Sequence, residues 1–172
     1  MEVNYFGLVA TTKAFLPLAR AHRGRIVNMC SMSGLIALGS DGIYSASKFA
    51  VEGFSDSLRK ELRPLGVAVV LINPAVVITP IWNKPPYDFP IDEQALSLYG
   101  PYFDGIDDTV AKLLASGDTT QVTDDAVVDA VANSRPQARY FVANVGGVPA
   151  VILAFLARVL PTHRFDLLLD LA

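Results

Sequence analysis

The chain has 172 residues, of which 52% are hydrophobic and 18% are charged, a composition typical of one folded domain with a substantial core. The 14 basic and 17 acidic residues give a net charge of −3 without any basic cluster, which argues against nucleic-acid binding. Cys30 is the only cysteine, so a disulfide framework and a thiolate metal cage are excluded.

Few residues suggest metal or thiol chemistry. Cys30 lies next to Ser31 in a predicted buried strand, so we expect a small core residue rather than a nucleophile. His22 and His163 lack metal-ligand partners at helical spacing, and we expect both at the surface and no metal site. We recognise no secretory leader, and the apolar stretch 148–160 is shorter than the ~20 residues that a membrane-spanning helix needs.

Residues 3–21 carry apolar side chains around most of the circumference of a helix, which predicts a helix buried on much of its surface. Asn4 begins this segment and, taken alone, is best explained as a polar residue that faces water. Residues 25–31 form a short apolar run that is typical of a buried parallel strand and ends at Ser31. Open α/β sheets bind ligands at the carboxyl ends of their strands, so the Ser31 hydroxyl could hold a substrate oxygen.

Residues 32–42 contain three glycines and predict a loop, and residues 43–64 predict a helix. We expect an ion pair between Asp56 and Lys60 on its wet side. Tyr44 and Lys48 fall one turn apart, where the ammonium would lower the phenol's pKa from its ordinary value of about 10 and form an acid/base pair. A Tyr-x-x-x-Lys spacing by itself is a weak signal that many helices contain by chance.

The second half is less regular. Residues 67–73 predict a strand in a right-handed parallel crossover, residues 108–115 and 124–133 predict helices, and residues 138–143 predict a third strand. Residues 80–124 are otherwise expected to be an irregular, functional segment, or else a poorly ordered insertion. Its aromatic residues are Trp82, Tyr87, Phe89, Tyr99, Tyr102 and Phe103.

The C-terminal tail predicts two short apolar helices separated by Pro161. Two interpretations stay open for it. The helices pack on the sheet or on a dimer partner, or they contact a membrane surface or a lipophilic substrate.

The order of these features resembles the short-chain dehydrogenase/reductase family: a strand ending in Ser31, a Gly-rich loop, the Tyr44/Lys48 helix, and a strand closing on Pro74. Asn4 matches a family pattern similar to Val-Asn-x-x-Gly. Residues 74–79 resemble Pro-Gly-x-Val-x-Thr, except that Ala75 stands where glycine is usual. If that position needs a positive φ, alanine costs about 1 kcal/mol. The tail resembles the hydroxysteroid- and retinol-dehydrogenase-like branch.

The resemblance implies an α/β fold: the C-terminal half of a Rossmann-like doubly wound parallel sheet with flanking helices. We expect one partial domain over residues 1–172, with a catalytic core at 1–79, a substrate loop at 80–124, and the last strand and C-terminal helices at 125–172. No G-x-x-x-G-x-G turn follows any predicted strand. We therefore expect an N-terminally truncated chain that is inactive alone because it lacks the Gly-rich cofactor half.

The chemistry implied by the resemblance is hydride transfer between NAD(P), with NADP favoured, and a lipophilic alcohol or carbonyl that is steroid-, retinoid- or long-chain-like. Tyr44 would be the general acid or base, Lys48 would lower its pKa and bind the nicotinamide ribose, Ser31 would hold the substrate oxygen, and Asn4 would organise a proton path to Lys48. The implied cofactor-binding residues are Tyr44, Lys48, Pro74, Val77 and Thr79.

We further expect a homo-oligomer located in the cytoplasm, with peripheral membrane contact through the apolar tail. An alternative is a truncated or inactive family fragment that acts only as a binding or oligomerisation module.

Overall fold

The computed structural model describes residues 1–39, 41–83 and 92–169, without the side chains of residues 101–104, 106 and 107. Its main sheet contains three strands in the order β1 (Arg25–Met29), β2 (Ala68–Pro74) and β3 (Arg139–Val142), and both neighbouring pairs are parallel. The α/β class and the three predicted strands are confirmed. Among the described residues β2 is the central strand and β1 lies at an edge.

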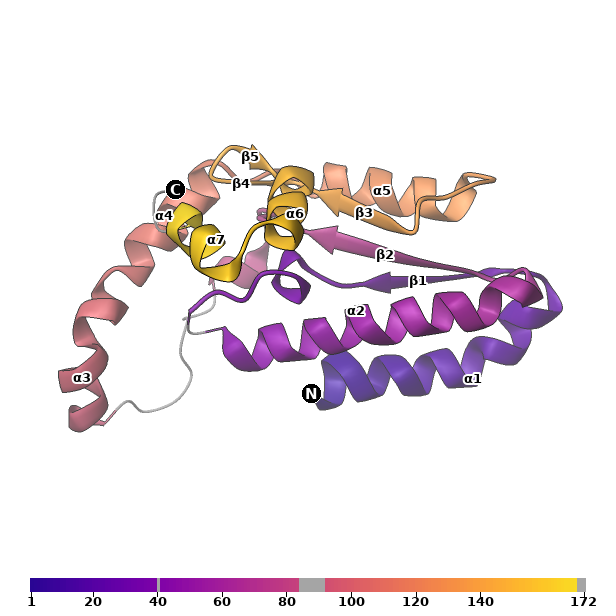
Figure 1. Cartoon of the computed structure of the whole chain (residues 1–172), viewed down its shortest axis with the longest axis horizontal. Coiled ribbons are helices and arrows are strands. Elements are labelled where there is room, and N and C mark those ends of the chain that lie inside the picture. The colour runs from indigo at the N-terminus through magenta and orange to yellow at the C-terminus, as the bar shows by residue number, and fades with distance from the viewer. Residues whose placement is uncertain (40, 84–91, 170–172) are drawn as a thin grey trace.

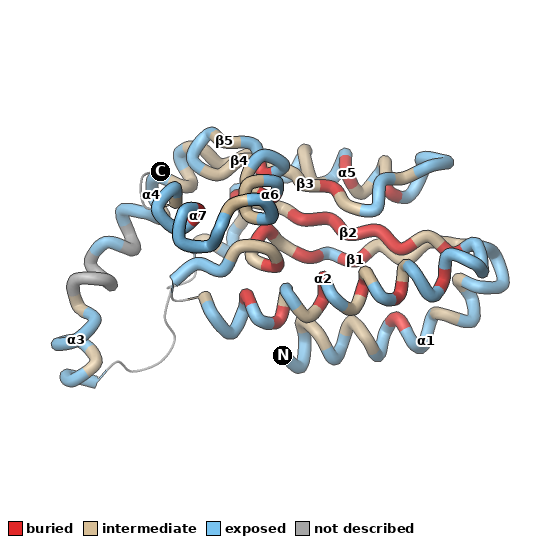
Figure 2. The backbone as a smooth tube through the Cα atoms, viewed as in Figure 1, coloured by how far each residue is buried: buried red, intermediate tan, exposed pale blue. Residues whose placement is uncertain are grey.

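Helices cover both faces of this sheet (Figure 1). Helices α1 (Leu8–Ala21) and α2 (Gly42–Leu62) lie on one face, and α5 (Gln121–Ala132) lies on the other. The alternation of β2 explains both layers, because Val69 and Leu71 pack against α2 while Val70 and Ile72 pack against α5. Figure 2 shows that the buried residues concentrate along β2 and on the helix sides that face it.

The first helical segment is less buried than its sequence suggested. A π-helical turn (Glu2–Gly7) leads into α1, and Thr12 is the one described residue of this segment that is buried. Val3 and Phe15 are 85% and 64% exposed. The expectation of a helix buried on much of its surface is therefore wrong, because α1 packs on one side only, where Leu16 and Ala19 meet the Leu58 and Leu62 cluster of α2.

Helix α2 ends at Leu62, two residues before the predicted end at Pro64. A 3-10 turn (Arg63–Leu65) follows it, and Gly66 then adopts a left-handed conformation with φ of +74° that ends the helix and directs the chain into β2. The predicted pair of Asp56 with Lys60 is wrong. Asp56 instead binds Arg59 at 2.9 Å and Arg139 at 2.7 Å.

Much of the segment expected to be irregular is helical. It contains a 3-10 turn (Pro80–Asn83), α3 (Glu93–Asp104) and α4 (Ile106–Ala115). The sequence indicated α4 but not α3, whose first turn is capped by Asp92, since the carboxylate of Asp92 accepts from the Ala95 amide at 2.6 Å. Helix α3 projects away from the sheet (Figure 1).

The C-terminal region begins with a hairpin of β4 (Asn144–Val145) and β5 (Val148–Pro149), which turns at Gly146 and Gly147. Helices α6 (Ala150–Val159) and α7 (Thr162–Leu169) follow on either side of Pro161, as the sequence predicted. Across residues 1–39, 41–83 and 92–169, no helix is both long and apolar enough to cross a bilayer.

Candidate active site

Ser31 follows β1 at the carboxyl edge of the sheet. Its extended backbone, with φ of −171° and ψ of 161°, leads into a 3-10 turn (Met32–Gly34), and its Oγ accepts from the Ser33 amide at 3.1 Å. The turn lies tightly against α2, since a Cβ added at Gly34 would lie 2.9 Å from Cys30 Sγ and 3.0 Å from the Lys48 carbonyl oxygen. A glycine at this position therefore lets the Ser31 turn approach the helix closely.

Tyr44 and Lys48 stand on the first turns of α2 beside Ser31. The Lys48 Nζ lies 5.5 Å from the centroid of the Tyr44 ring and donates at 3.4 Å to the Met29 carbonyl at the end of β1. The Ser31 side chain lies close enough to the Tyr44 phenol to influence its pKa, and Tyr44 is 40% exposed. The structure thus brings together Ser31, Tyr44 and Lys48, although their catalytic roles stay predictions.

Burial has the largest effect on the pKa values of Tyr44 and Lys48. Burial raises the pKa of the Tyr44 phenol above its ordinary value, outweighing the nearby Ser31 side chain, which lowers it. Burial also lowers the pKa of the Lys48 ammonium. The pKa of Tyr44 is therefore shifted in the direction opposite to our expectation from the sequence. That expectation included the neighbouring ammonium but not the loss of hydration.

Asn4 reaches α2 from the opening helical turn. Its Nδ2 donates at 3.1 Å to the Ser47 Oγ, and that hydroxyl donates at 2.6 Å to the Tyr44 carbonyl. Asn4 is half-buried, so the interpretation of a side chain that simply faces water is wrong. Its described bond goes to the neighbour of Lys48, and its part in a proton path stays a prediction.

The other predicted cofactor residues are Pro74, which ends β2, and Val77 and Thr79 in the loop after it. The Ala75 amide donates at 2.9 Å to the Val142 carbonyl, and Ala75 is not among the residues with positive φ, so alanine causes no strain there. Val77 pairs with Asp118 in a parallel bridge, and its carbonyl accepts from the Trp82 indole at 2.8 Å. The Thr79 carbonyl accepts from the Trp82 amide at 3.3 Å. Their contacts with a cofactor stay predictions.

The predicted aromatic surface is only partly described. Tyr87 and Phe89 lie outside the described residues, as do the side chains of Tyr102 and Phe103. Tyr99 is exposed on α3, whereas Trp82 binds the loop after β2.

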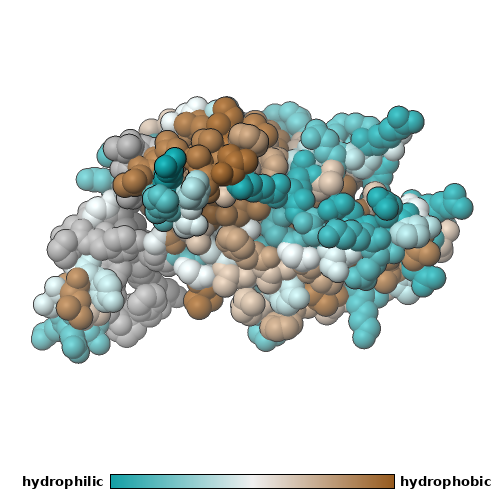
Figure 3. All heavy atoms as spheres, in the orientation of Figure 1, coloured by the Kyte–Doolittle hydropathy of each residue, from teal (hydrophilic) through white to brown (hydrophobic). Residues whose placement is uncertain are grey.

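Apolar residues also gather at this end of the sheet. Ala150 and Ala154 of α6 pack against Met32, next to Ser31, and the same cluster includes Ala75. The opposite side of α6 exposes Val151, Ile152, Phe155 and Val159. Figure 3 shows hydrophobic side chains gathered over α6 and α7. An apolar surface therefore begins beside the Ser31 turn.

Sequence reasoning missed a buried polar cluster next to Ser31, Tyr44 and Lys48. Glu52, one turn beyond Lys48, binds Asn73 of β2 and Arg139 of β3. Two signals could have indicated it, because Asn73 is the one polar residue in the apolar run 67–74 and Glu52 shares the face of Lys48 at a spacing of four.

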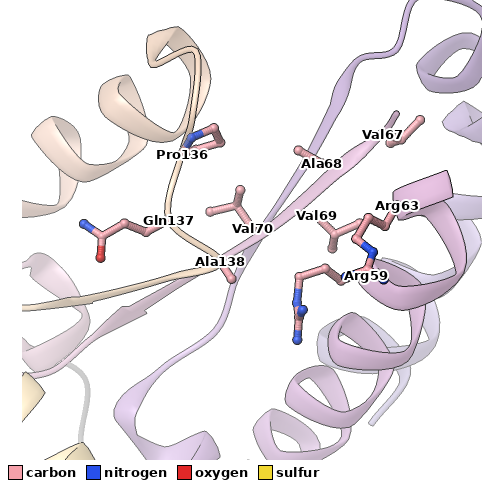
Figure 4. Close-up of a pocket in the computed structure, with 9 residues that line it drawn as sticks. All are labelled: Arg59, Arg63, Val67, Ala68, Val69, Val70, Pro136, Gln137 and Ala138. Atoms are coloured by element: carbon pink, nitrogen blue, oxygen red, sulfur yellow. The ribbon is translucent and has the colours of Figure 1, made fainter. Parts of the chain in front are cut away.

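Two shallow cavities lie near the opposite, amino end of β2, away from Ser31 and Tyr44. The larger, of about 380 Å³, is lined by Pro17, Arg20, Ala21 and Leu65. The smaller, of about 150 Å³, is lined by residues of α2, β2 and the segment before β3 (Figure 4): Arg59, Arg63, Val67, Ala68, Val69, Val70, Pro136, Gln137 and Ala138. Side-chain chemistry, rather than cavity shape, therefore locates the candidate active site.

Sequence comparison relates the chain to known dehydrogenases. The family model described as short chain dehydrogenase matches residues 1–87, just over half of the 172 residues. The mitochondrial D-beta-hydroxybutyrate dehydrogenase of Rattus norvegicus is 37% identical over 154 residues, covering 81% of this chain and 44% of that enzyme. Retinol dehydrogenase 5 of Mus musculus is 45% identical over 83 residues, covering 48% of this chain and 26% of that enzyme.

Solved structures show the same relationship. A short-chain dehydrogenase from Streptomyces avermitilis superposes with a TM-score of 0.66 at 25% identity, over 96% of this chain and 57% of that one. A short chain dehydrogenase from Burkholderia cenocepacia J2315 in complex with NADP superposes with a TM-score of 0.56 at 26% identity, over 81% of this chain and 47% of that one. The chain spans about half the length of these proteins, or less.

Proposed function

Because the chain belongs to the short-chain dehydrogenase/reductase family, we propose that its residues carry the proton-transfer side of an oxidoreductase that interconverts an alcohol and a carbonyl compound. The observation that carries this proposal is the grouping of Ser31, Tyr44 and Lys48 at the carboxyl edge of the sheet. Hydride transfer to a carbonyl carbon needs a proton at the oxygen, and a positioned phenol can supply it.

Each residue has a defined task in this proposal. Tyr44 donates its phenolic proton to the substrate oxygen in reduction and accepts it in oxidation. The raised pKa of Tyr44 keeps the phenol protonated at neutral pH, which suits proton donation. The Ser31 hydroxyl hydrogen-bonds the same substrate oxygen and orients it toward Tyr44. Lys48 places a positive charge against the Tyr44 ring, and Asn4 supports α2 through Ser47.

The residues present fit the nicotinamide end of a cofactor. An ammonium has three donors, so the contact of Lys48 with Met29 leaves capacity for ribose hydroxyls. Pro74, Val77 and Thr79 would line the nicotinamide side. A bound nicotinamide supplies or accepts the hydride. Our preference for NADP over NAD is supported by the NADP complex of the Burkholderia relative.

For the substrate we propose a lipophilic alcohol or carbonyl, steroid-, retinoid- or long-chain-like, as in the hydroxysteroid- and retinol-dehydrogenase-like branch. The support is the apolar cluster of Met32, Ala75 and Ala154 beside Ser31. Burial of apolar surface contributes about 25 cal/mol per Å², so such substrates should outcompete short polar ones.

A chimera tests both proposals. In it, this chain replaces the matching residues of the NADP-binding Burkholderia cenocepacia relative, and NADP(H)-linked turnover is measured with lipophilic alcohols, sugars and short hydroxy acids. We expect the highest kcat/KM with a lipophilic alcohol. Higher kcat/KM with sugars or hydroxy acids would overturn the substrate class, and no turnover with any of them would overturn the activity.

The alternative function is that of a binding or oligomerisation module. Two features of the described residues would serve such a module: the edge position of β1, where open backbone groups can pair, and the exposed Val3 and Phe15. For the 172-residue chain alone we expect weak NADPH binding, self-association by light scattering and no turnover, because its sequence has no Gly-rich turn for the pyrophosphate. A monomer that binds NADPH with micromolar affinity would contradict this.

Peripheral membrane contact is also part of the proposal. The exposed apolar stripe of α6 is accompanied by exposed basic residues, Arg158 on α6 and Arg164 on α7, that suit anionic headgroups. Co-sedimentation with anionic vesicles, reduced by a Phe155→Ser substitution, is the expected result. Equal sedimentation with and without vesicles would exclude such contact.

A further inference from the structure

Glu52 is a buried carboxylate that takes no part in the proposed proton transfer. It is 6% exposed and lies one helical turn beyond Lys48 on α2. Its Oε2 accepts from the Nε and Nη2 of Arg139 at 2.9 and 2.7 Å, and its Oε1 accepts from the Asn73 Nδ2 at 2.5 Å. Burial of a carboxylate is costly unless partners of this kind replace its water.

These partners belong to β2 and β3. Asn73 is fully buried and directly precedes Pro74, where the predicted nicotinamide loop begins. Arg139 opens β3 and also binds Asp56, one turn further along α2, at 2.7 Å. The carboxylate of Glu52 therefore joins α2 to β2 and β3 through directional bonds.

The stem of Glu52 meets the Ser31 turn as well. A Cβ added at Gly34 would lie 3.1 Å from the Glu52 Cγ, on the same side as the Cys30 thiol and the Lys48 carbonyl. The Cys30 thiol donates to that carbonyl at 3.4 Å. Glu52 thus touches the turn that follows Ser31 and lies one helical turn from Lys48.

We propose that Glu52 is a positioning residue. It fixes the rotation of α2 about its own axis and the position of α2 along β2, so that Lys48 and Tyr44 stay beside Ser31. The inference rests on the proposed function, which identifies Ser31, Tyr44 and Lys48 as the residues that must be positioned. An apolar side chain could also pack α2 on the sheet, and replacement of a buried ion pair by apolar residues is often neutral in stability. Unlike apolar packing, the carboxylate forms directional hydrogen bonds, and these reach two different strands.

The test measures the environment of Lys48 in the purified chain. Lysines are labelled competitively with acetic anhydride over a range of pH values, and mass spectrometry gives the pKa of each, with exposed Lys13 and Lys60 as internal references. In Glu52→Gln the pKa of Lys48 is expected to rise toward its ordinary value, because a displaced ammonium regains water. Simple loss of a nearby negative charge would lower that pKa, so the sign of the shift separates the two effects.

Asp56→Asn is the matched control, because it removes a carboxylate from the same helix and the same arginine without touching Asn73 or Gly34. It should leave the pKa of Lys48 as in the unsubstituted chain. An unchanged or lowered pKa in folded Glu52→Gln, or an equal rise in both variants, would overturn the proposal.

If circular dichroism shows that Glu52→Gln does not fold, Arg139→Lys is read in the same way, since lysine keeps the charge but not the two-point contact. A rise in the pKa of Lys48 supports the proposal, and an unchanged value overturns it. The labelling needs no turnover. An inactive chimera combined with the expected shift would therefore overturn the proposed function and leave the positioning role standing.

Discussion

The ammonium of Lys48 lies 5.5 Å from the centre of the Tyr44 ring and at the same time reaches the carbonyl of Met29, at the end of β1. One helical turn thus places a phenol and an ammonium together, and the end of the neighbouring strand sets the position of the pair. An ammonium over a ring face is attracted by the ring quadrupole. Burial, which is the largest influence on both groups, raises the pKa of Tyr44 and lowers that of Lys48.

The close approach of the Ser31 turn to α2 predicts opposite effects for two glycine substitutions. Gly34→Ala should lower the free energy of unfolding by about 1 to 3 kcal/mol, because its methyl group would overlap Cys30 and the Lys48 carbonyl. Gly53→Ala, in the interior of α2 with open space at its Cβ position, should raise it by about 0.5 to 1 kcal/mol. Urea denaturation measures both, and equal effects would contradict the described packing.

A buried hydrogen bond between β1 and α2 predicts a second pair of effects. The Asn28 Nδ2 donates to the Ser55 Oγ at 2.8 Å, and both side chains are buried. Ser55→Ala should cost about 1 to 3 kcal/mol, because it leaves a buried donor unsatisfied. Ser57→Ala, which loses an exposed bond to Glu61 on the same helix, should stay within about 0.5 kcal/mol of the unsubstituted chain. A loss for Ser57→Ala as large as for Ser55→Ala would contradict this account.

The thiol of Cys30 predicts a loss of stability at alkaline pH. Burial, followed by the charge of Glu52, raises its pKa from 9.0 to about 12. The folded chain therefore favours the protonated thiol, and this contribution is fully present below pH 9 and lost as pH rises from 9 toward 12.

Denaturant unfolding at a series of pH values should accordingly show a steeper alkaline loss for the unsubstituted chain than for Cys30→Ala. Iodoacetamide at pH 8 should modify Cys30 only after urea is added. Identical pH slopes for the two proteins, or rapid modification of the folded chain, would show that the thiol is not held as described.

Local patterns predicted the parts of the fold that depend on neighbouring residues. Apolar runs, helical spacing and proline chemistry predicted the strand that begins at Arg25, the one-turn spacing of Tyr44 and Lys48, and the helix break at Pro161. Cys30 is buried and His22 and His163 are exposed, as expected. These features need no knowledge of what packs against them.

Features that depend on distant partners were not predicted. Asp56 has Lys60 at a suitable spacing, yet it binds Arg139, which is 83 residues away in sequence and enters with β3. The raised pKa of Tyr44 depends on burial by the folded chain, and α3 depends on a cap at Asp92 within a proline-rich stretch. The spacing of Glu52 from Lys48 and the lone polar Asn73 in its apolar run were visible in the sequence, but their hydrogen bond forms only when α2 packs on β2.

Replacement of Tyr44 by phenylalanine in the Burkholderia chimera tests the central claim most directly, because only the phenolic oxygen is removed. We expect kcat to fall by about 100-fold or more, since general acid–base catalysis is worth about 10²- to 10⁴-fold, while NADPH binding followed by fluorescence changes little. Retention of more than about a tenth of the turnover would contradict the assignment of Tyr44 as the proton donor and acceptor.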